Sequence, residues 1–563
     1  MSLRKFARSL IACGAAVSLV VPLSAIPASA ASSPTLAHLD DGLTRRLQTA
    51  PESALIPVIV EGANPISLVG DNSTRAQQAE SRVRGNGGRV VGSSELLGAS
   101  VAELTPAQIR NLASDPAIGN IHVDADVKAT DAVADANTAS GTPITFQQST
   151  GATQAWAAGD TGQGVTVAVL DSGIQNNTAA FGSRIKARVD FVDPAQPAQG
   201  DPAGHGTHIA GIVAASRTFA SPGLAPDASL VSVRVLDPSG SSRLSTVIHG
   251  LEWIIAHKDA LGIRVVTMAL GAPASGSYRD DPLAAAAEMA WRSGLVVVAA
   301  AGNTGPTAGS ISTPGIDPLV VTAGAADESG TPSTSDDVIP SWSSEGPTAD
   351  HIAKPDLVAP GRMIVSVRVP GSTIDRALPT HVEGPQLFRL SGTSEATAVT
   401  AGAAALLVEH NRGATPDQVK ALLVRNATRL AGASPAAQGS GELNVARALQ
   451  AGLPTDAQQH ARPSDGLLKL LFLLDPRELA DALHVNWDHV NWDSVNSDHV
   501  NWDSVNSDHV NWDSVNWDSV NWDHVNWDHV NWDHVNWDHV NWDSVNWDHV
   551  NWDHVNWDIA SLD

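Results

Sequence analysis

Short apolar, valine-rich runs alternate with helix-like segments between residue 164 and about residue 449, and this alternation limits the fold most strongly. Within 244–255 the apolar residues recur at helical spacing, which predicts an amphipathic helix. Continuous apolar strands that alternate with such helices favour an α/β domain with a mainly parallel sheet flanked by helices. The runs that predict its strands are 165–170, 230–236, 263–268 and 295–301.

Three chemically reactive side chains occur where this fold gathers active residues, near the carboxyl ends of parallel strands. Asp171 follows the first predicted strand. His205 opens a predicted helix in Gly-His-Gly-Thr-His, and Ser394 ends Leu-Ser-Gly-Thr-Ser before an Ala-rich helix. A serine hydroxyl is a poor nucleophile until an imidazole takes its proton, and the imidazole needs a carboxylate to fix its tautomer. These three residues are of the types that an Asp-His-Ser catalytic triad requires.

In this order the three segments resemble the subtilisin-like family of serine peptidases (subtilases), and the predicted peptidase domain spans 151–452. The resemblance implies a subtilisin-like fold and a serine endopeptidase that hydrolyses polypeptide substrates through an acyl-enzyme. It assigns Ser394 as nucleophile, His205 as general base and then acid, and Asp171 as the orienting carboxylate. We expect the enzyme to be a monomer.

Further segments match the family's substrate-binding parts. Asn303, after a Val- and Ala-rich run, matches the residue that donates to the oxyanion together with the backbone N–H of Ser394. The resemblance also implies an edge strand at residues 269–271 that pairs with extended substrate. The residues assigned to substrate binding are Ala269, Leu270, Gly271, Ala301 and Gly302.

Two positions beside the nucleophile depart from the family pattern: Glu395 stands where Met is usual, and Ala398 where Pro is usual. We hypothesise that a carboxylate near His205 favours the charged imidazole and moves the acidic limb of activity to higher pH. The alternative is that Glu395 points away and changes little. The departures also leave open a peptide-binding pseudoenzyme, and His205 with His208 leaves open a metal pair.

A small α+β pattern occupies 55–128, with strands predicted at 56–60 and 89–91, a helix after Thr105, and a closing strand at 118–127. It resembles the inhibitor-type propeptide that precedes many family members and acts as their intramolecular inhibitor. A zymogen follows from this resemblance, with its activation cut in the exposed linker 129–150. An ordinary accessory domain is the alternative. The segment 31–54 is a short leader without an evident role.

The first thirty residues have a positive start, an apolar run and a small-residue cleavage site, which indicates a secretory signal peptide. A membrane-spanning helix is the alternative. The single cysteine, Cys13, lies inside this segment, so the exported protein has neither thiol nor disulfide. We expect a secreted enzyme that needs no cofactor for its chemistry. The family resemblance makes structural calcium an expectation, although no ligand set is evident from spacing.

Fifteen uninterrupted copies of His/Ser-Val-Asn-Trp/Ser-Asp occupy 484–558, joined to the peptidase domain by a linker with a short helix at 453–483. They hold thirteen of the seventeen tryptophans and account for 15 of the 26 net negative charges. Four interpretations remain open: a low-complexity linker, cell-wall carbohydrate binding by Trp faces, zinc binding by His and Asp, or a rectangular solenoid. If the repeats define the function, the protein is a cell-wall or surface binding protein. The acidic balance argues against nucleic-acid binding.

Overall fold

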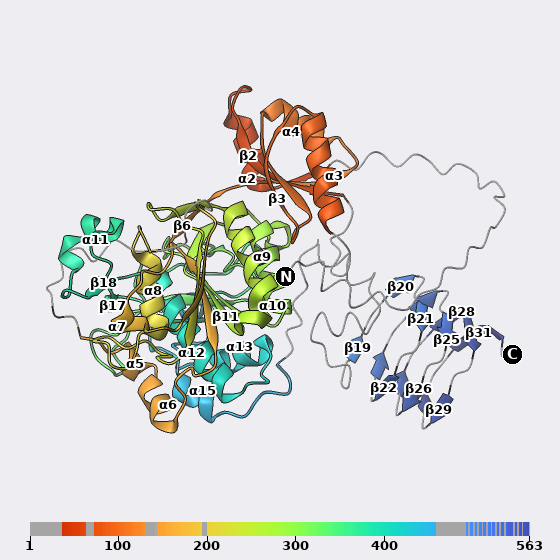
Figure 1. The fold of residues 1–563 in the computed structure, drawn as a ribbon. Coiled ribbons are helices and arrows are strands. Elements are labelled where there is room, and N and C mark those ends of the chain that lie inside the picture. The colour runs from red at the N-terminus through yellow and green to blue at the C-terminus, as the bar shows by residue number, and fades with distance from the viewer. Residues whose placement is uncertain are drawn as a thin grey trace. The chain divides into compact units, whose positions relative to one another are not determined.

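The computed structural model describes residues 37–63, 72–130, 141, 143–193 and 200–457, and the backbone of short strands between 491 and 561. The chain divides into two compact units, Met1–Leu468 and Lys469–Asp563 (Figure 1). The predicted signal peptide with Cys13, and the short helix predicted within 458–483, lie outside the described residues. None of the described helices has the length and apolar character that crossing a membrane requires.

An N-terminal subdomain, residues 37–123, folds around a five-stranded sheet in the order β1-β5-β2-β4-β3. Only the β1–β5 pair is parallel. Thr105 and Gln108 form a capping box at the start of α4, the helix predicted after Thr105. The structure differs from the boundary predicted at residue 55, because β1 and α2 of the leader belong to this subdomain. Its elements are β1 (His38–Leu39), α2 (Asp41–Thr49), β2 (Ile56–Gly62), α3 (Asn72–Gly85), β3 (Arg89–Ser94), β4 (Ala99–Leu104), α4 (Pro106–Ala113) and β5 (Ile118–Val123).

The peptidase domain is built on a seven-stranded sheet in which every pair of neighbours is parallel. All four predicted strands and the helix predicted at 244–255 are confirmed, with ends that differ by a few residues. In sheet order the strands are β16 (Leu357–Pro360), β15 (Val321–Ala326), β13 (Val296–Ala300), β11 (Ile263–Met268), β7 (Thr166–Asp171), β9 (Ser229–Arg234) and β8 (Ile185–Asp190).

Helices and shorter strands complete the domain (Figure 1). The longer helices are α8 (His205–Ala214), α9 (Leu244–Leu261), α10 (Pro282–Arg292), α12 (Thr393–His410) and α13 (Pro416–Arg425). Short elements are α5 (Phe146–Ser149), α6 (Ala152–Ala158), α7 (Thr178–Phe181), α11 (Thr373–Ala377), α14 (Pro435–Gln438), α15 (Val445–Gln450), η1 (Tyr278–Asp280) and η2 (Pro379–His381). The remaining strands are β6 (Asp126–Ala129), β10 (Ser241–Arg243), β12 (Leu270–Pro273), β14 (Ser312–Thr313), β17 (Ile364–Val367) and β18 (Leu387–Leu390).

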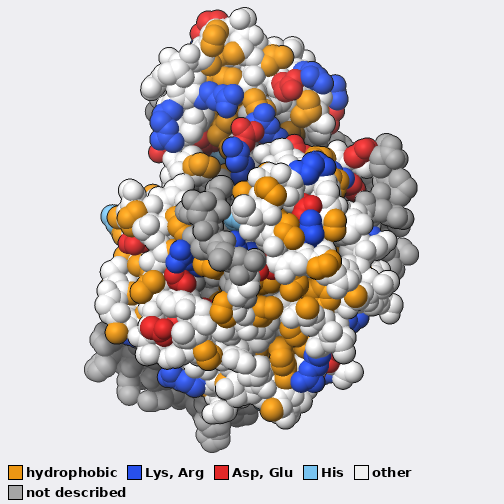
Figure 2. All heavy atoms as spheres, turned by 90° about the vertical axis from the view of Figure 1, so that its left-hand side faces the viewer, with side chains coloured by type: hydrophobic (Ala, Val, Ile, Leu, Met, Phe, Trp, Pro, Cys, Tyr) orange, Lys and Arg blue, Asp and Glu red, His pale blue; other side chains and the backbone are white. Residues whose placement is uncertain are grey.

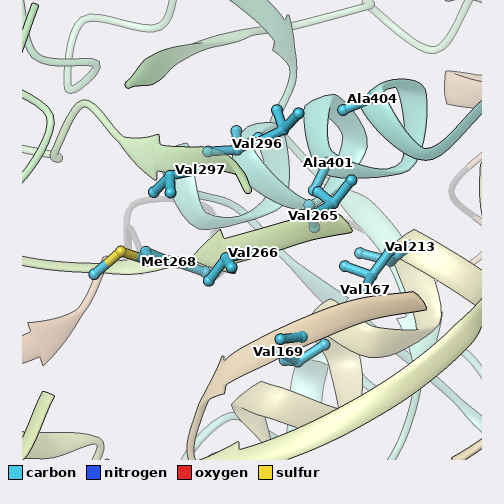
Figure 3. Close-up of a cluster of buried hydrophobic side chains, with 14 of the residues drawn as sticks. Val167, Val169, Val213, Val265, Val266, Met268, Val296, Val297, Ala401 and Ala404 are labelled. Carbon is cyan, nitrogen blue, oxygen red and sulfur yellow. The ribbon is translucent and has the colours of Figure 1, made fainter. Parts of the chain in front are cut away.

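Helix α12 runs through the centre of the domain, and its residues 393–408 are all buried. Small side chains allow this close approach to the sheet, because Ala401 and Ala404 project no bulk beyond Cβ. Figure 3 shows both alanines in one cluster with valines of β7, β11 and β13 and with Val213 of α8. Each fully buried Val side chain contributes about 1.5–3 kcal/mol. The packed core therefore holds the start of α12, where the predicted nucleophile stands, in a fixed position.

The segment predicted as one closing strand, 118–127, is two strands. Strand β5 stays in the N-terminal subdomain, whereas β6 lies between β10 and β12 of the peptidase domain. The break falls at Asp124, whose carboxylate accepts the backbone N–H of Ser245 at 2.9 Å and its hydroxyl at 2.8 Å. The linker 129–150 also differs from the exposed segment that we predicted, because α5 lies within it and Phe146 is buried.

Glu328 ties this end of the linker to the end of β15: its carboxylate accepts the Thr145 hydroxyl at 3.1 Å and also the Ser149 hydroxyl. Burial raises the pKa of Glu328 from 4.5 to about 7. A carboxyl whose pKa is raised on folding contributes stability below pH 4.5 that is lost as the pH rises through 7. The shift corresponds to about 3 kcal/mol.

Glu328→Gln keeps a neutral hydrogen-bonding side chain, so its free energy of unfolding should not fall between about pH 4.5 and 8 on this account. Relative to this variant, the parent should lose about 3 kcal/mol over the same interval. Urea unfolding at both pH values, in a Ser394→Ala background to prevent self-digestion, measures the difference. An equal pH dependence in the two chains would contradict the role given to Glu328.

In the C-terminal unit, short parallel strands stack in successive turns of the backbone. They run from β19 (Asn491–Asp493) to β31 (Asn556–Ser561), and β28 (Asn536–Asp543) is the longest. The three-residue strands pair in register with strands twenty residues away, such as Asn491 with Asn511 and Asn496 with Asn516. Four pentapeptides therefore complete one turn. Of the four interpretations of the repeats, this backbone has the form of the solenoid.

The charge of the chain is unevenly distributed. Figure 2 shows acidic and basic side chains interspersed over one face of the molecule, without an extended patch of one sign. The repeats, in contrast, carry Asp in every copy and neither Lys nor Arg.

Candidate active site

Asp171 and His205 are in direct contact. Asp171 is the last residue of β7, and His205 is the first residue of α8. The distance between His205 Nδ1 and Asp171 Oδ1 is 2.8 Å, and each side chain is only 1% exposed. The backbone N–H of Ser172 donates to the same carboxylate oxygen at 2.6 Å. The arrangement holds the imidazole in one orientation, and Nε2 is the nitrogen that a catalytic triad would use for proton transfer.

Ser394 lies in the first turn of α12, which packs against α8. Its hydroxyl donates to the carbonyl of Ala269 at 2.9 Å and accepts the backbone N–H of Thr130 at 3.1 Å. The Ser394 and Thr130 hydroxyl oxygens are 2.7 Å apart. The predicted nucleophile thus touches a residue of the linker that precedes the peptidase domain.

Asn303 follows β13, and both ends of its amide are used. Its Oδ1 accepts the backbone N–H of Thr393 at 3.0 Å and the Thr393 hydroxyl at 2.9 Å. Its Nδ2 donates to the carbonyl of Thr130 at 2.5 Å, and the backbone N–H of Ser394 approaches the same oxygen at 3.4 Å. Two donors from different segments therefore converge on one carbonyl oxygen, which is the arrangement of an oxyanion hole.

The linker approaches these donors as an extended strand. β6 pairs antiparallel with β12, with Ala129 opposite Leu270 and Lys128 opposite Gly271, and the N–H of Thr130 reaches the carbonyl of Ala269 at 3.4 Å. The predicted edge strand at 269–271 thus binds an extended segment. The other side of that segment is bound by β10, which the sequence did not reveal.

The other residues assigned to substrate binding, Gly271, Ala301 and Gly302, make close contacts with neighbouring segments. A Cβ on Gly271 would lie 2.7 Å from the Ser312 hydroxyl, so the position admits no side chain. Ala301 pairs with the backbone of Ser312, and Gly302, at φ 107°, donates its N–H to the Thr393 hydroxyl at 3.1 Å. These contacts hold the segments that carry Asn303 and Ser394 in place.

A second buried carboxylate, Asp201, holds the first turn of α8. It accepts four bonds, from the Ser172 hydroxyl, the Gly204 N–H, and the N–H and hydroxyl of Thr207, all between 2.7 and 2.8 Å. The Ser172 hydroxyl in turn accepts the N–H of Gly206 at 2.9 Å. Asp201 therefore links the loop after Asp171 to α8, the helix that carries His205. Sequence reasoning missed it, although an Asp shortly before a helix is a capping signal.

The two departures near the nucleophile are both fully buried. Glu395 Oε1 lies 3.9 Å from the Nε2 of His208, so its carboxylate faces the second histidine of α8. Among the described residues, no three His, Cys, Asp or Glu side chains are grouped as metal ligands would be.

Comparison with known proteins identifies the family of the chain. Residues 162–441 match the model of the subtilase family. Serine protease AprX of Bacillus subtilis is 38% identical over 354 residues, covering 61% of this chain and 77% of the relative. Subtilisin Savinase of Lederbergia lenta is 36% identical over 288 residues, covering 51% and 91%. The chain therefore belongs to the subtilase family of serine endopeptidases.

A solved structure supports the fold. Fervidolysin from Fervidobacterium pennivorans, a keratinolytic enzyme related to subtilisin, superposes with a TM-score of 0.56 at 20% identity. The match covers 75% of this chain and 64% of fervidolysin. At this identity the likeness concerns the architecture alone.

Proposed function

We propose that the chain is the self-processing zymogen of a secreted serine endopeptidase, with Asp171, His205 and Ser394 as its catalytic triad. One observation carries the proposal. The carbonyl of Thr130 accepts Asn303 Nδ2 at 2.5 Å and faces the N–H of Ser394, whose hydroxyl contacts the same residue. A peptide bond about to be attacked needs this placement of its carbonyl oxygen and of the nucleophile.

The proposed reaction proceeds in two stages. In the first, His205 Nε2 takes the proton of Ser394, whose Oγ attacks the carbonyl carbon and forms a tetrahedral intermediate. The imidazolium, stabilised by Asp171, then gives this proton to the leaving nitrogen, so that the C–N bond breaks and an acyl-enzyme remains. In the second, His205 activates water, which releases the acid and regenerates the Ser394 hydroxyl. Asp171 orients the imidazole and takes no proton in either stage.

The oxyanion formed in both stages lies between Asn303 and the backbone N–H of Ser394. Thr393 orients the Asn303 amide through its N–H and hydroxyl, so the donor is in place before charge develops. A preorganised donor stabilises the transition state without further rearrangement. The chain's own residues perform these steps, and the calcium that the resemblance implies would have a structural role.

Inhibition by the N-terminal subdomain is supported by how it contacts the peptidase domain. β6 occupies the place of a substrate strand between β10 and β12. Asp124 accepts the N–H of Ser245 in the first turn of α9, whose own N-cap makes no side-chain bond. Glu252 of α9 accepts the hydroxyl of Ser94 and the N–H of Leu96, both at 2.6 Å. These contacts favour a propeptide over an unrelated accessory domain.

The position of Thr130 leads to a specific cleavage site. Because its carbonyl is bound by both oxyanion donors, the activation cut should fall between Thr130 and Asp131, near the start of the predicted interval 129–150. Mass spectrometry and N-terminal sequencing of the secreted protein should find Asp131 as the new N-terminus. Thr130→Pro should block this cut, since proline fixes φ and removes the N–H that Ser394 accepts. A new N-terminus at any residue other than Asp131 would refute the assignment.

Secretion is proposed from the sequence pattern of the first thirty residues.

For the repeats we propose binding to cell-wall carbohydrate, supported by the register of the solenoid, which aligns the Trp positions of successive turns, such as Trp512 with Trp532. The flat rings of Trp side chains suit stacking on sugar rings. Cosedimentation with cell walls of full-length Ser394→Ala, but not of the same variant ending at residue 457, is the expected result. Equal cosedimentation of both chains would refute it.

A further inference from the structure

A second histidine–carboxylate pair lies beside the proposed triad. His208 stands one turn after His205 on α8, and Glu395 directly follows Ser394 on α12. Both side chains are completely buried, and 3.9 Å separates His208 Nε2 from Glu395 Oε1. The reaction proposed above uses neither residue. The pair nevertheless joins the helix of the general base to the helix of the nucleophile.

Burial explains why the two residues depend on each other. A carboxylate removed from water is strongly destabilised unless a positive partner compensates for its charge. The His208 imidazole, at 3.9 Å, supplies such compensation when it is protonated. The dependence is one-sided, because a neutral histidine can be buried beside an apolar side chain, whereas an ionised Glu395 without its partner cannot.

Contacts around the pair fix both helices close to the proposed active site. The carbonyl of His208 accepts the Ser366 hydroxyl at 2.9 Å, which fixes this turn of α8 to β17. At the other helix, the N–H of Thr393, one residue before the nucleophile, is held by Asn303 at 3.0 Å. Both helix segments are thus anchored separately, and the His208–Glu395 contact joins them at the level of the site.

We propose that Glu395 and His208 are positioning residues, a buried carboxylate–imidazolium pair that sets the approach of His205 to Ser394. This inference rests on the proposed triad. A displacement of about 1 Å between reacting groups can reduce a rate by about 100-fold. The pair is therefore expected to affect kcat more than KM, since β6, in the place of the substrate strand, pairs with β10 and β12 and not with either helix of the pair.

Three variants test the pair: His208→Leu, Glu395→Met, and the double variant. Rates of hydrolysis of a peptide substrate give kcat and KM. The kcat is expressed per active site, and the sites are counted by titration with a serine-directed phosphonate. His208→Leu should lower kcat per titrated site at least about tenfold with KM within about twofold, because Glu395 loses its partner. Glu395→Met should lower kcat by a smaller factor, about three- to tenfold at unchanged KM, because the contact between the helices is lost but a neutral His208 tolerates an apolar neighbour. The double variant should match Glu395→Met and exceed His208→Leu in kcat, because the unpaired carboxylate is gone while the contact between the helices is still missing.

The matched control is Thr400→Val on α12, since the Thr400 hydroxyl is buried and bonds to Ala396 of its own helix, at 2.8 Å. It should leave kcat and KM per titrated site unchanged. If His208→Leu is not secreted, recovery of yield in the double variant supports the pair and failure to recover overturns it. Full activity of His208→Leu also overturns it. If the phosphonate does not label Ser394 in the parent, the proposed triad itself fails.

Discussion

Ser394→Ala is expected to remain a single chain, uncut at Thr130, and to lose essentially all peptidase activity. Without the hydroxyl, His205 has no proton to take and no acyl-enzyme can form. Removing the nucleophile of a subtilisin lowers kcat about 10⁶-fold, a magnitude measured on that member of the family and adopted for this one. Casein hydrolysis and the mass of the secreted protein measure both effects.

The matched control for Ser394→Ala is Ser391→Ala, three residues earlier. The Ser391 hydroxyl accepts the N–H of Met363 at 2.9 Å and lies outside the triad, so this variant should still be cut and should hydrolyse casein. A Ser394→Ala chain that still matures when produced alone would show that another enzyme makes the cut. A variant that kept its peptidase activity would exclude the triad.

The strands of the central sheet and the contact between Asp171 and His205 could be predicted because each depends on local pattern. Valine-rich runs bounded by glycine indicate buried parallel strands, and the ends of such strands meet at one edge of the sheet. Asp171 ends β7, while His205 and Ser394 open helices that pack against each other. The family resemblance then added Asn303, which donates to the Thr130 carbonyl as an oxyanion donor would.

Other features depend on contacts between distant segments, which no local pattern reveals. The break between β5 and β6 follows from the bond of Asp124 to Ser245, 121 residues away. Thr130 is one polar residue among many in the linker, and only the fold brings its carbonyl beside Asn303. Glu395 was expected either near His205 or pointing away, and its partner His208 became evident only from the packing of α8 on α12.

Asn303→Leu is expected to lower kcat about 10²–10³-fold, corresponding to about 2.7–4 kcal/mol, while KM changes little. This magnitude was also measured on a subtilisin, so the family supplies it. The direction follows from the structure. The amide donates to a carbonyl oxygen whose negative charge appears only when Ser394 attacks, so its loss affects the transition state more than the bound substrate.

Thr393→Val separates the donor from its support. The Thr393 hydroxyl donates to Asn303 Oδ1 at 2.9 Å, but the backbone N–H of the same residue still holds the amide at 3.0 Å. We therefore expect a fall in kcat of less than about tenfold, the equivalent of one ordinary hydrogen bond. Initial rates over a range of peptide concentrations give kcat and KM for both variants. If Asn303→Leu raised KM and left kcat intact, the amide would be a substrate-binding group, and the oxyanion would depend on the N–H of Ser394 alone.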